Sequence, residues 1–255
     1  MWRALRIAVL LTVLVFVAAG AWVDRRRTTD WDSTLWVGIF PIVADSSPAT
    51  SRYVGALTDA QFESIATFFE REARDYGIAL ERPVKLQRYP VVQELPPRLA
   101  TDASVLGRMA WSLRMRAYAW QQARNTLADI RVFVLYHDPE HTPSVPHSLG
   151  LQKGLLGVVY AFAEAEMDGQ NAIVIAHEVM HTLGATDKYD LANGLPRYPD
   201  GYAEPAAQPR LPQDAAEIMA GRIAIAPDEA RMPDSLEDVV VGDATAIEIH
   251  WRDAR

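Results

Sequence analysis

The sequence predicts an α+β fold in which helices pack on a β-sheet, followed by an irregular C-terminal part. Short apolar runs rich in Val, Ile, Leu and Phe are typical of buried strands, and they alternate with longer segments whose apolar residues recur at helical spacing. After residue 184 this periodicity is lost, and five prolines follow between residues 196 and 212. A chain of 255 residues, 49% of them hydrophobic, can bury a sizeable core around such a sheet.

The first 27 residues predict a membrane anchor or a signal segment. Two arginines precede 17 uncharged, mostly apolar residues, a run that is long for a signal peptide and slightly short for a full membrane span. Residues 19–21, "AGA", offer a cleavage site, yet Arg25, Arg26 and Arg27 follow closely and would resist translocation. We favour an uncleaved anchor with the domain of residues 28–255 outside the cytoplasm, and secretion after cleavage is the alternative.

Four apolar runs are predicted as strands and three periodic segments as helices. The strands are expected within residues 35–45, 83–92, 130–138 and 153–166, and Pro41 in the first run favours an edge strand or a bulge. The helices are expected at residues 58–77, where Thr58 and Gln61 form a capping box, at 101–124, and at 172–183. The four arginines of the second helix most simply form a solvated face. Residues 234–251 are predicted to end the fold as a helix.

Charge and cysteine content exclude several functions. Without residues 1–27, which carry five arginines and one aspartate, the net charge changes from −8 to −12. So acidic a domain disfavours nucleic acid as a partner, because nucleic-acid binding needs a basic surface. The absence of cysteine excludes disulfides, cysteine ligands to a metal and a latency switch based on a thiol.

The segment "AIVIAHEVMHTLGATDKYD", residues 172–190, predicts a metal-binding helix. His177 and His181 are four residues apart, so a helix places both imidazoles on one face, with their Cβ atoms about 6 Å apart. Two imidazoles at this separation can bind one metal ion. Glu178 lies beside both ligands, where it can contact water at the metal and not the metal itself. This is the H-E-x-x-H arrangement of zinc peptidases.

A third ligand is expected from the segment that follows this helix. A catalytic zinc ion is held by three protein ligands and a water molecule. The helix is expected to start from Asn171 as N-cap and to end at Gly184, which can adopt a positive φ and turn the chain back sharply. Asp187 follows three residues later and brings an anionic oxygen to the site.

The complete pattern His177-Glu178-x-x-His181-x-x-Gly184-x-x-Asp187 resembles the metzincin signature, with aspartate in place of the usual third histidine. Snapalysin-type and immune-inhibitor-A-type metallopeptidases show the same substitution. The resemblance covers residues 171–190 and, less closely, residues 216–221, where Met219 would form the methionine turn beneath the histidine rings.

The resemblance implies a zincin-like fold with a twisted mixed sheet. Its upper part would comprise residues 28–184 and its lower part residues 185–255. In this fold the run at 153–166 would be the antiparallel edge strand above the cleft. An exposed edge offers unpaired backbone groups to which an extended peptide can bind.

The implied function is that of a zinc-dependent endopeptidase that acts on peptides or proteins. One catalytic zinc ion would be held by His177, His181 and Asp187. Glu178 would be the general base that takes a proton from water and later returns it to the leaving amine. Four residues are candidates for stabilising the oxyanion: Tyr189, Tyr198, Tyr202 and Arg222.

Two alternatives follow from the same residues. In a gluzincin-like peptidase, Glu204 or Glu217 would replace Asp187 as the third ligand. In a membrane-tethered binding module the zinc would be structural, and such a site normally closes with a fourth protein ligand, for which Asp190 is the nearby candidate. A further metal site is conceivable at His137, His141 and His147, but histidines in a proline-rich loop are usually exposed, and we interpret them so.

Overall fold

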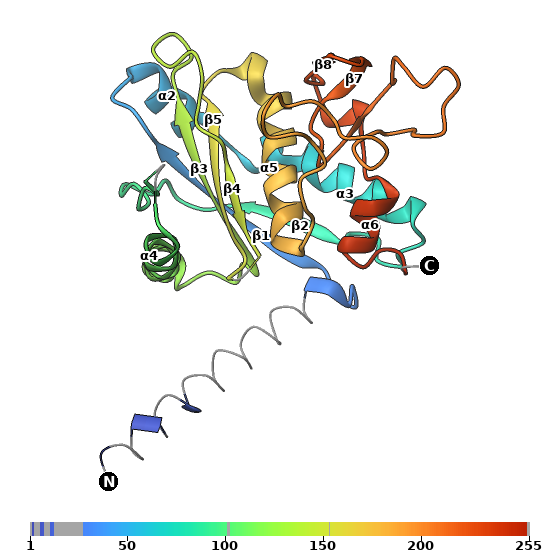
Figure 1. Cartoon of the computed structure of the whole chain (residues 1–255). Helices are drawn as coiled ribbons and strands as arrows, with labels where there is room; N and C mark the ends of the chain where they lie inside the picture. The colour runs from blue at the N-terminus through green and yellow to red at the C-terminus, as the bar shows by residue number, and fades with distance from the viewer. Residues whose placement is uncertain are drawn as a thin grey trace.

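The computed structural model describes residues 2, 6–7, 11–12, 28–100, 103–152 and 154–253 (Figure 1). Both hydrophobic clusters lie between Trp31 and Trp251. The predicted anchor or signal segment at residues 1–27 falls almost entirely outside the described residues. In the part of the chain that is described, no helix has the length and apolarity needed to cross a bilayer.

A five-stranded mixed sheet forms the centre of the described chain, with strand order β2-β1-β3-β5-β4. Its strands are β1 (Leu35–Val43), β2 (Val84–Arg88), β3 (Ile130–His137), β4 (Leu149–Leu151) and β5 (Leu156–Phe162). The pairs β1–β2, β1–β3 and β3–β5 are parallel, and β4 runs antiparallel to β5. The predicted α+β class and the four predicted strands are therefore confirmed.

The predicted place of the antiparallel edge strand is wrong. The run at 153–166 forms β5, which is internal and parallel to β3, with Val158 opposite Phe133. The antiparallel edge is β4, a strand of only three residues, Leu-Gly-Leu, that follows a proline-containing loop. So short a segment shows no alternation of apolar and polar residues, which is the signal by which a strand is recognised in a sequence.

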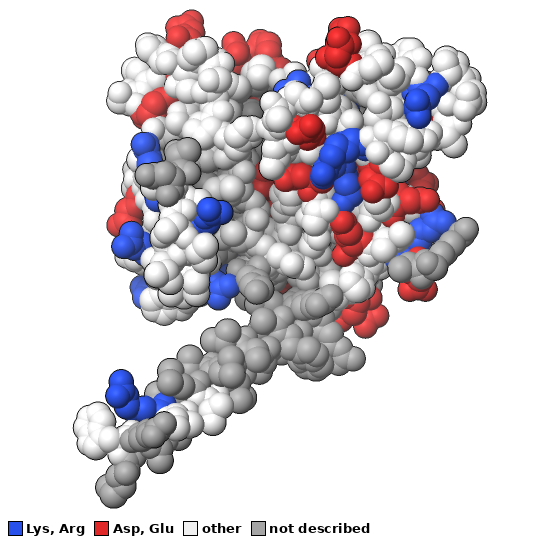
Figure 2. Space-filling model, viewed as in Figure 1, with Lys and Arg blue, Asp and Glu red and all other residues white. Residues whose placement is uncertain are grey.

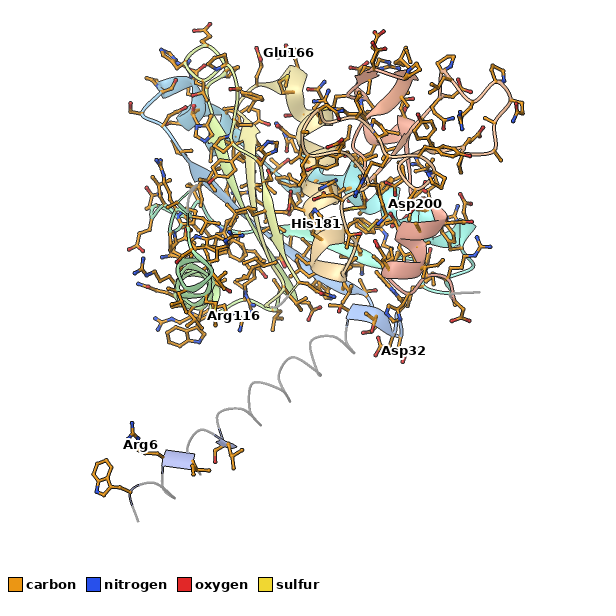
Figure 3. All side chains as sticks on the ribbon, viewed as in Figure 1. Arg6, Asp32, Arg116, Glu166, His181 and Asp200 are labelled. Atoms are coloured by element: carbon orange, nitrogen blue, oxygen red, sulfur yellow. The ribbon has the colours of Figure 1, made fainter. Side chains whose placement is uncertain are left out.

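Helices cover both faces of the sheet. In chain order they are α2 (Pro48–Ala56), η1 (Asp59–Phe62), α3 (Glu63–Asp75), α4 (Val105–Ala123), η2 (Ala165–Met167) and α5 (Asp168–Leu183). The α3 and α5 helices bury their apolar faces in one cluster, and α4 buries its own in a second cluster on the opposite face. Arg116 and His181 mark these two sides in Figure 3. The capping box of Thr58 and Gln61 is confirmed at η1.

The part after α5 consists of short elements. They are β6 (Ala216–Glu217), β7 (Ile223–Ala226), β8 (Glu229–Arg231), η3 (Leu236–Asp238), β9 (Val239–Val240) and α6 (Asp243–Glu248). The helix predicted over residues 234–251 is therefore correct only at 243–248. Residues 239–241 are three consecutive valines, whose branched Cβ atoms favour an extended backbone, and β9 pairs there with β6.

The α3 helix joins the sheet to this C-terminal part. One Nη atom of Arg71 donates to the carbonyl oxygens of Leu236 (3.0 Å) and Val239 (2.6 Å), and the Glu72 carboxylate accepts from the Val241 amide at 2.6 Å. Trp251 packs its ring against Phe69 on α3 and against Tyr76, just after the helix ends. These contacts fix the position of residues 236–251 relative to α3.

Candidate metal centre

The α5 helix begins one turn earlier than the sequence predicts. It starts at Asp168, with Met167 in the N-cap position, so the prediction of Asn171 as N-cap is wrong. The Asn171 side chain accepts from the backbone amide of Phe162 at 3.1 Å and donates to its carbonyl at 2.8 Å. Asn171 therefore connects the helix to the end of β5, which fixes the angle at which α5 crosses the sheet.

The far end of α5 agrees with the prediction. Gly184 has φ 111°, in the left-handed region, and its amide donates to the carbonyl of His181 at 3.2 Å. A side chain at this position would be strained. The chain turns back here, and the four residues that follow, 185–188, form what we term the ligand loop.

His177, Glu178 and His181 form a group that could hold one metal ion. Their potential ligand atoms all lie within 4.8 Å of one another. The two imidazole centroids are 4.7 Å apart, and the rings are nearly perpendicular, at 84°. The spacing of four residues thus brings both rings to one face of α5, as predicted.

Each imidazole is oriented by a backbone carbonyl. His177 Nδ1 lies 2.9 Å from the oxygen of Ile218, and His181 Nδ1 lies 2.8 Å from that of Ala185. A carbonyl oxygen can only accept, so each Nδ1 carries a proton and donates it. In the neutral ring the Nε2 atom then presents a lone pair, the form in which histidine binds a metal.

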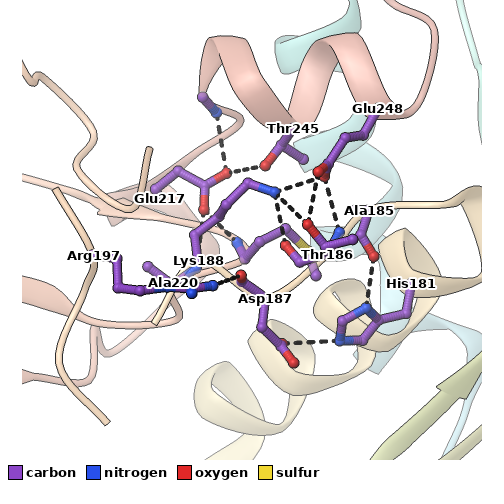
Figure 4. Close-up of polar contacts among 12 residues, drawn as sticks. His181, Ala185, Thr186, Asp187, Lys188, Arg197, Glu217, Ala220, Thr245 and Glu248 are labelled. Carbon is purple, nitrogen blue, oxygen red and sulfur yellow. Dashed lines mark hydrogen bonds and ion pairs between the residues drawn. The ribbon is translucent and has the colours of Figure 1, made fainter. Parts of the chain in front are cut away.

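Asp187 meets both imidazoles at these Nε2 atoms. Its Oδ1 lies 3.2 Å from His177 Nε2 and 3.1 Å from His181 Nε2, and Figure 4 shows the contact with His181. With both Nδ1 atoms protonated, three electron-pair donors converge, and Oδ1 is buried with no hydrogen-bond donor. Such an arrangement is costly unless a cation or an extra proton lies between the donors.

The close approach of these groups also shifts the pKa values of His181 and Asp187. Burial lowers the pKa of His181, but the Asp187 carboxylate and the Glu178 charge outweigh it, and the pKa is raised overall. Burial raises the pKa of Asp187, and the two histidines outweigh it, so that the pKa lies far below its usual range. The site therefore favours a carboxylate together with positive charge.

The position of Asp187 is set by its neighbours in the ligand loop (Figure 4). Glu248 on α6 accepts from the Thr186 amide at 2.9 Å and hydroxyl at 2.7 Å, and from Lys188 Nζ at 2.7 Å. Lys188 is buried, and Arg197 donates to the Asp187 carbonyl at 2.6 Å. Lys188, Arg197 and Glu248 were not predicted. Lys188 and Glu248 are sixty residues apart, a separation that leaves no local signal, and Arg197 binds a backbone carbonyl ten residues away.

Glu178 is buried beside the two histidines. Only 4% of its surface is exposed, burial raises the pKa of its carboxyl, and Oε2 has no hydrogen-bond partner within the described chain. The β4 strand lies directly against this carboxylate. A Cβ atom at Gly150 would come within 2.8 Å of the Glu178 carbonyl oxygen and 3.0 Å of Oε2, so the strand can approach only because Gly150 has no side chain.

Met219 lies in a tight turn, as predicted. The amides of Ala220 and Gly221 donate to the Glu217 carbonyl at 3.0 and 2.9 Å, and Gly221 has φ 68°. Met219 is fully buried, and its carbonyl accepts from the Lys188 amide at 2.9 Å. The turn therefore contacts the ligand loop through Met219 and α5 through the neighbouring Ile218. A contact of the thioether with the imidazoles stays a prediction.

The structure places neither Glu217 nor Glu204 at the metal ligands. Both carboxylate oxygens of Glu217 accept hydrogen bonds elsewhere, Oε2 from the Met219 amide (2.7 Å) and Oε1 from the Thr245 hydroxyl (2.6 Å). Glu217 thus stabilises the turn at Met219. Glu204 is exposed and borders a different cavity, together with Asp243. Asp190 is also exposed, and its carboxylate accepts from the Ala192 amide at 2.9 Å within its own loop.

A cavity of about 340 Å³ adjoins His177 and Glu178, and we term it the site cavity. Its lining includes the apolar residues Val145, Pro146, Tyr160, Ile173, Val174 and Met232. Of the four candidate oxyanion stabilisers, Tyr189 and Arg222 line it. Tyr198 and Tyr202 do not, and their rings pack on each other with centroids 5.4 Å apart.

The three histidines of the 137–147 segment do not converge. His137 stacks on Tyr160 with ring centroids 6.1 Å apart, and His141 Nδ1 lies 3.1 Å from a carboxylate oxygen of Asp138. His147 is exposed and borders the site cavity. Among the described residues these three histidines do not form a metal-binding group. The interpretation of all three as exposed is wrong for His137, which is half-buried.

No protein-family model and no curated protein matches the sequence. Among solved structures, the chain is similar to two crystal structures of wild-type OgpA from Akkermansia muciniphila, with TM-scores of 0.41 and 0.35 and 9% sequence identity in each case. The matches cover 85% of this chain and 59% of the OgpA chain, so this chain spans less than two thirds of that protein. A likeness this distant carries no argument about function.

Proposed function

We propose that this protein is a zinc-dependent endopeptidase whose metal ligands are His177, His181 and Asp187. One observation carries the proposal. Two imidazole lone pairs and a buried carboxylate oxygen converge with no proton donor between them, beside the buried Oε2 atom of Glu178, which has no hydrogen-bond partner among the described residues. By contrast, both carboxylate oxygens of Glu217 are occupied by hydrogen bonds. At the candidate metal centre, Asp187 Oδ1 and Glu178 Oε2 are buried without a hydrogen-bond partner among the described residues.

The donor set fits zinc. Two neutral imidazoles and one carboxylate are ligands that catalytic zinc ions use, with a position left open for water. The carbonyl oxygens of Ile218 and Ala185 orient the rings, as outer partners do at metal sites. When bound there, zinc would supply a Lewis acid that polarises a peptide carbonyl and acidifies water.

Glu178 is the general base in this proposal. Its Oε2 atom is buried and free of hydrogen bonds, so it can accept a proton from the water that attacks the scissile carbonyl. The same oxygen then donates that proton to the leaving amine, because cleavage of an amide requires that the nitrogen be protonated. Tyr189 and Arg222 line the site cavity and are proposed to stabilise the oxyanion.

The substrate is proposed to bind along β4. This strand pairs with β5 on one side, and no other described strand pairs with its second side. Such an edge can add an extended peptide through backbone hydrogen bonds. Because Gly150 lies against Glu178, a peptide on this edge would pass directly over the general base. The site cavity would then receive a substrate side chain, and its lining favours an apolar one.

The test is metal-dependent hydrolysis. Purified protein is incubated with a quenched casein-type substrate and a peptide library, first as isolated, then after removal of metal with a chelator, and finally with zinc restored. We expect cleavage that the chelator abolishes and zinc restores. Zinc-loaded protein that cleaves nothing across the library would contradict the proposal and favour a binding module with a structural zinc site.

A further inference from the structure

The α4 helix exposes a continuous apolar stripe on its outer face. Four large side chains project from it at spacings of three, four and seven residues, which place them on one side of the helix. They are Leu106, Met109, Leu113 and Trp120, with 76%, 59%, 67% and 67% of their surfaces exposed. The opposite side of α4 is buried in the core through Trp111, Met115, Tyr118, Ala119 and Ala123. The helix is therefore apolar on two sides, and the described chain covers only one of them.

The stripe continues at both ends of α4. Val105 is 71% exposed at its start, and Leu127, just after its end, is 89% exposed. Single exposed apolar residues are normal on a protein surface, but a contiguous row marks a place where another phase or molecule binds. We term the row from Val105 to Leu127 the α4 stripe.

The charge of this segment differs from that of the rest of the protein. Residues 103–128 contain four arginines and no acidic residue. Residues 28–255 carry −12, and the segment contributes +4, so all other residues of the domain together carry −16. Arg108, Arg114 and Arg124 are exposed. In Figure 2 basic side chains surround the α4 end at the lower left, whereas most acidic side chains lie at the top and right.

A cavity beside α4 is also lined by basic side chains. It measures about 620 Å³ and lies between the helix and the 95–100 segment, where Arg98, Arg108 and His137 line it. No described carboxylate lines it, and the buried Nε2 of His137 has no hydrogen-bond partner. The cavity thus presents cationic and donor groups next to an apolar stripe.

We propose that α4 is a membrane-docking helix that binds the surface of a bilayer containing anionic phospholipids. Helices that lie in a membrane interface carry Leu and Trp on one side and arginine beside them, as α4 does. The stripe would enter the boundary between head groups and acyl chains, and the arginines would contact the lipid phosphates. The adjoining cavity is large enough to receive an anionic head group.

Charge favours a membrane over a second copy of this chain. Two α4 stripes in contact would bring the arginines of both copies together without a carboxylate from either helix. An anionic bilayer instead complements them. Docking would leave the candidate metal centre accessible, since α5 lies on the other face of the sheet. Asp32, near the start of the described domain, and Arg116 on α4 both lie at the lower side of Figure 3. This proposal does not depend on the proposed peptidase activity.

The absence of cysteine allows a direct test in the full-length chain. Leu113→Cys is labelled with a fluorophore that responds to polarity, and the protein is reconstituted into vesicles of phosphatidylcholine alone or mixed with phosphatidylserine. The control label is at Glu229→Cys, an exposed position on β8. We expect the label at 113 to shift to the blue and to be quenched by brominated lipid only in the anionic vesicles. The label at 229 should report water in both.

Charge variants sharpen this test. Each arginine near an anionic surface strengthens binding about fivefold, so Arg114→Gln with Arg124→Gln should weaken docking roughly 30-fold. The matched control, Arg52→Gln with Arg231→Gln, removes the same charge from two exposed positions away from α4 and should leave docking unchanged.

Three results would overturn the proposal. They are a label at 113 that reports water in anionic vesicles, equal shielding in both kinds of vesicle, and shielding that grows with the ratio of protein to lipid. The last result would assign the α4 stripe to contacts between copies. Unchanged thermal unfolding of each variant shows that a negative result does not come from misfolding.

Discussion

Two segments of this protein carry several histidines within a short distance, and only one of them forms a candidate metal site among the described residues. His177 and His181 project from a helix, and each donates its Nδ1 proton to a backbone carbonyl. His137, His141 and His147 lie in or next to a loop, and each has a different environment. The number of histidines is similar in the two segments, so it does not decide which of them can bind a metal.

The difference lies in the groups that surround the rings. At the candidate metal centre the ligand loop brings Asp187 to both Nε2 atoms, and Glu248 on α6 holds that loop. In the 137–147 segment the nearby carboxylate, Asp138, is occupied by the Ser47 hydroxyl and the Glu140 amide as well as by His141. Two conditions therefore make the α5 histidines a candidate metal site. Backbone carbonyls fix the tautomer of each ring, and one carboxylate oxygen of Asp187 has no hydrogen-bond donor.

The largest expected effect is that of removing one ligand. His181→Ala leaves two protein ligands, so the protein should lose its zinc and its hydrolytic activity together. His141→Ala, the matched change in the other segment, should retain both, because His141 is exposed and its ring pairs with Asp138. The measurement is the zinc content of each purified variant. Equal zinc loss in both variants would remove the distinction between the two segments.

A smaller effect is expected when the support of the third ligand is weakened. Glu248→Gln removes the negative charge that faces buried Lys188 and should let the ligand loop move. Loss of an outer partner commonly lowers metal affinity 10- to 100-fold. Zinc affinity is measured by competition with a chelator, and Glu237→Gln, at an exposed position, is the control. An unchanged affinity in Glu248→Gln would show that Asp187 does not depend on this pair.

The methionine turn should tolerate a conservative change. Met219 is fully buried, and leucine has nearly the same volume, so Met219→Leu should cost less than about 1.5 kcal/mol of unfolding free energy. Met219→Ala leaves a cavity and should cost about 2–5 kcal/mol. Denaturant unfolding measures both, with zinc content as a second readout. If Met219→Leu lost zinc, the sulfur would have a role beyond packing.

The smallest effect concerns acid stability in the 137–147 segment. The Ser47 hydroxyl lowers the pKa of Asp138 below its ordinary 3.8, and although burial opposes this, the Glu140 amide and His141 add to it. A lowered pKa in the folded state means that the Asp138 carboxylate stabilises the fold above about pH 4, and that this contribution is lost as the pH falls further. Asp138→Asn should therefore flatten the acid side of a plot of melting temperature against pH. An unchanged slope below pH 4 would contradict this.

The sequence predicts those parts of the site that depend on local spacing. An interval of four residues places His177 and His181 on one face of any helix, and Gly184 ends the helix as a left-handed residue in the way its position indicates. The strands β1, β3 and β5 are also recognisable, because each is a run of mostly buried apolar residues.

Long-range contacts are what the sequence does not reveal. Asn171 is a good N-cap residue, yet its side chain binds the backbone of Phe162 because the strand β5 ends beside it. Gly150 matters only because β4 is pressed against Glu178. The partners of Glu248 and Glu217 come from other segments of the chain, so no local pattern distinguishes these carboxylates from metal ligands.

The central claim is that the group on α5 is catalytic, and Glu178→Gln tests it most directly. Glutamine has the size of glutamate and cannot accept the proton, so zinc content and thermal stability should stay near those of the unmodified protein. Hydrolysis of the quenched substrate should fall by about 10²-fold or more, as expected for loss of a positioned general base. Hydrolysis by Glu178→Gln at the rate of the unmodified protein, with equal zinc content, would contradict the claim.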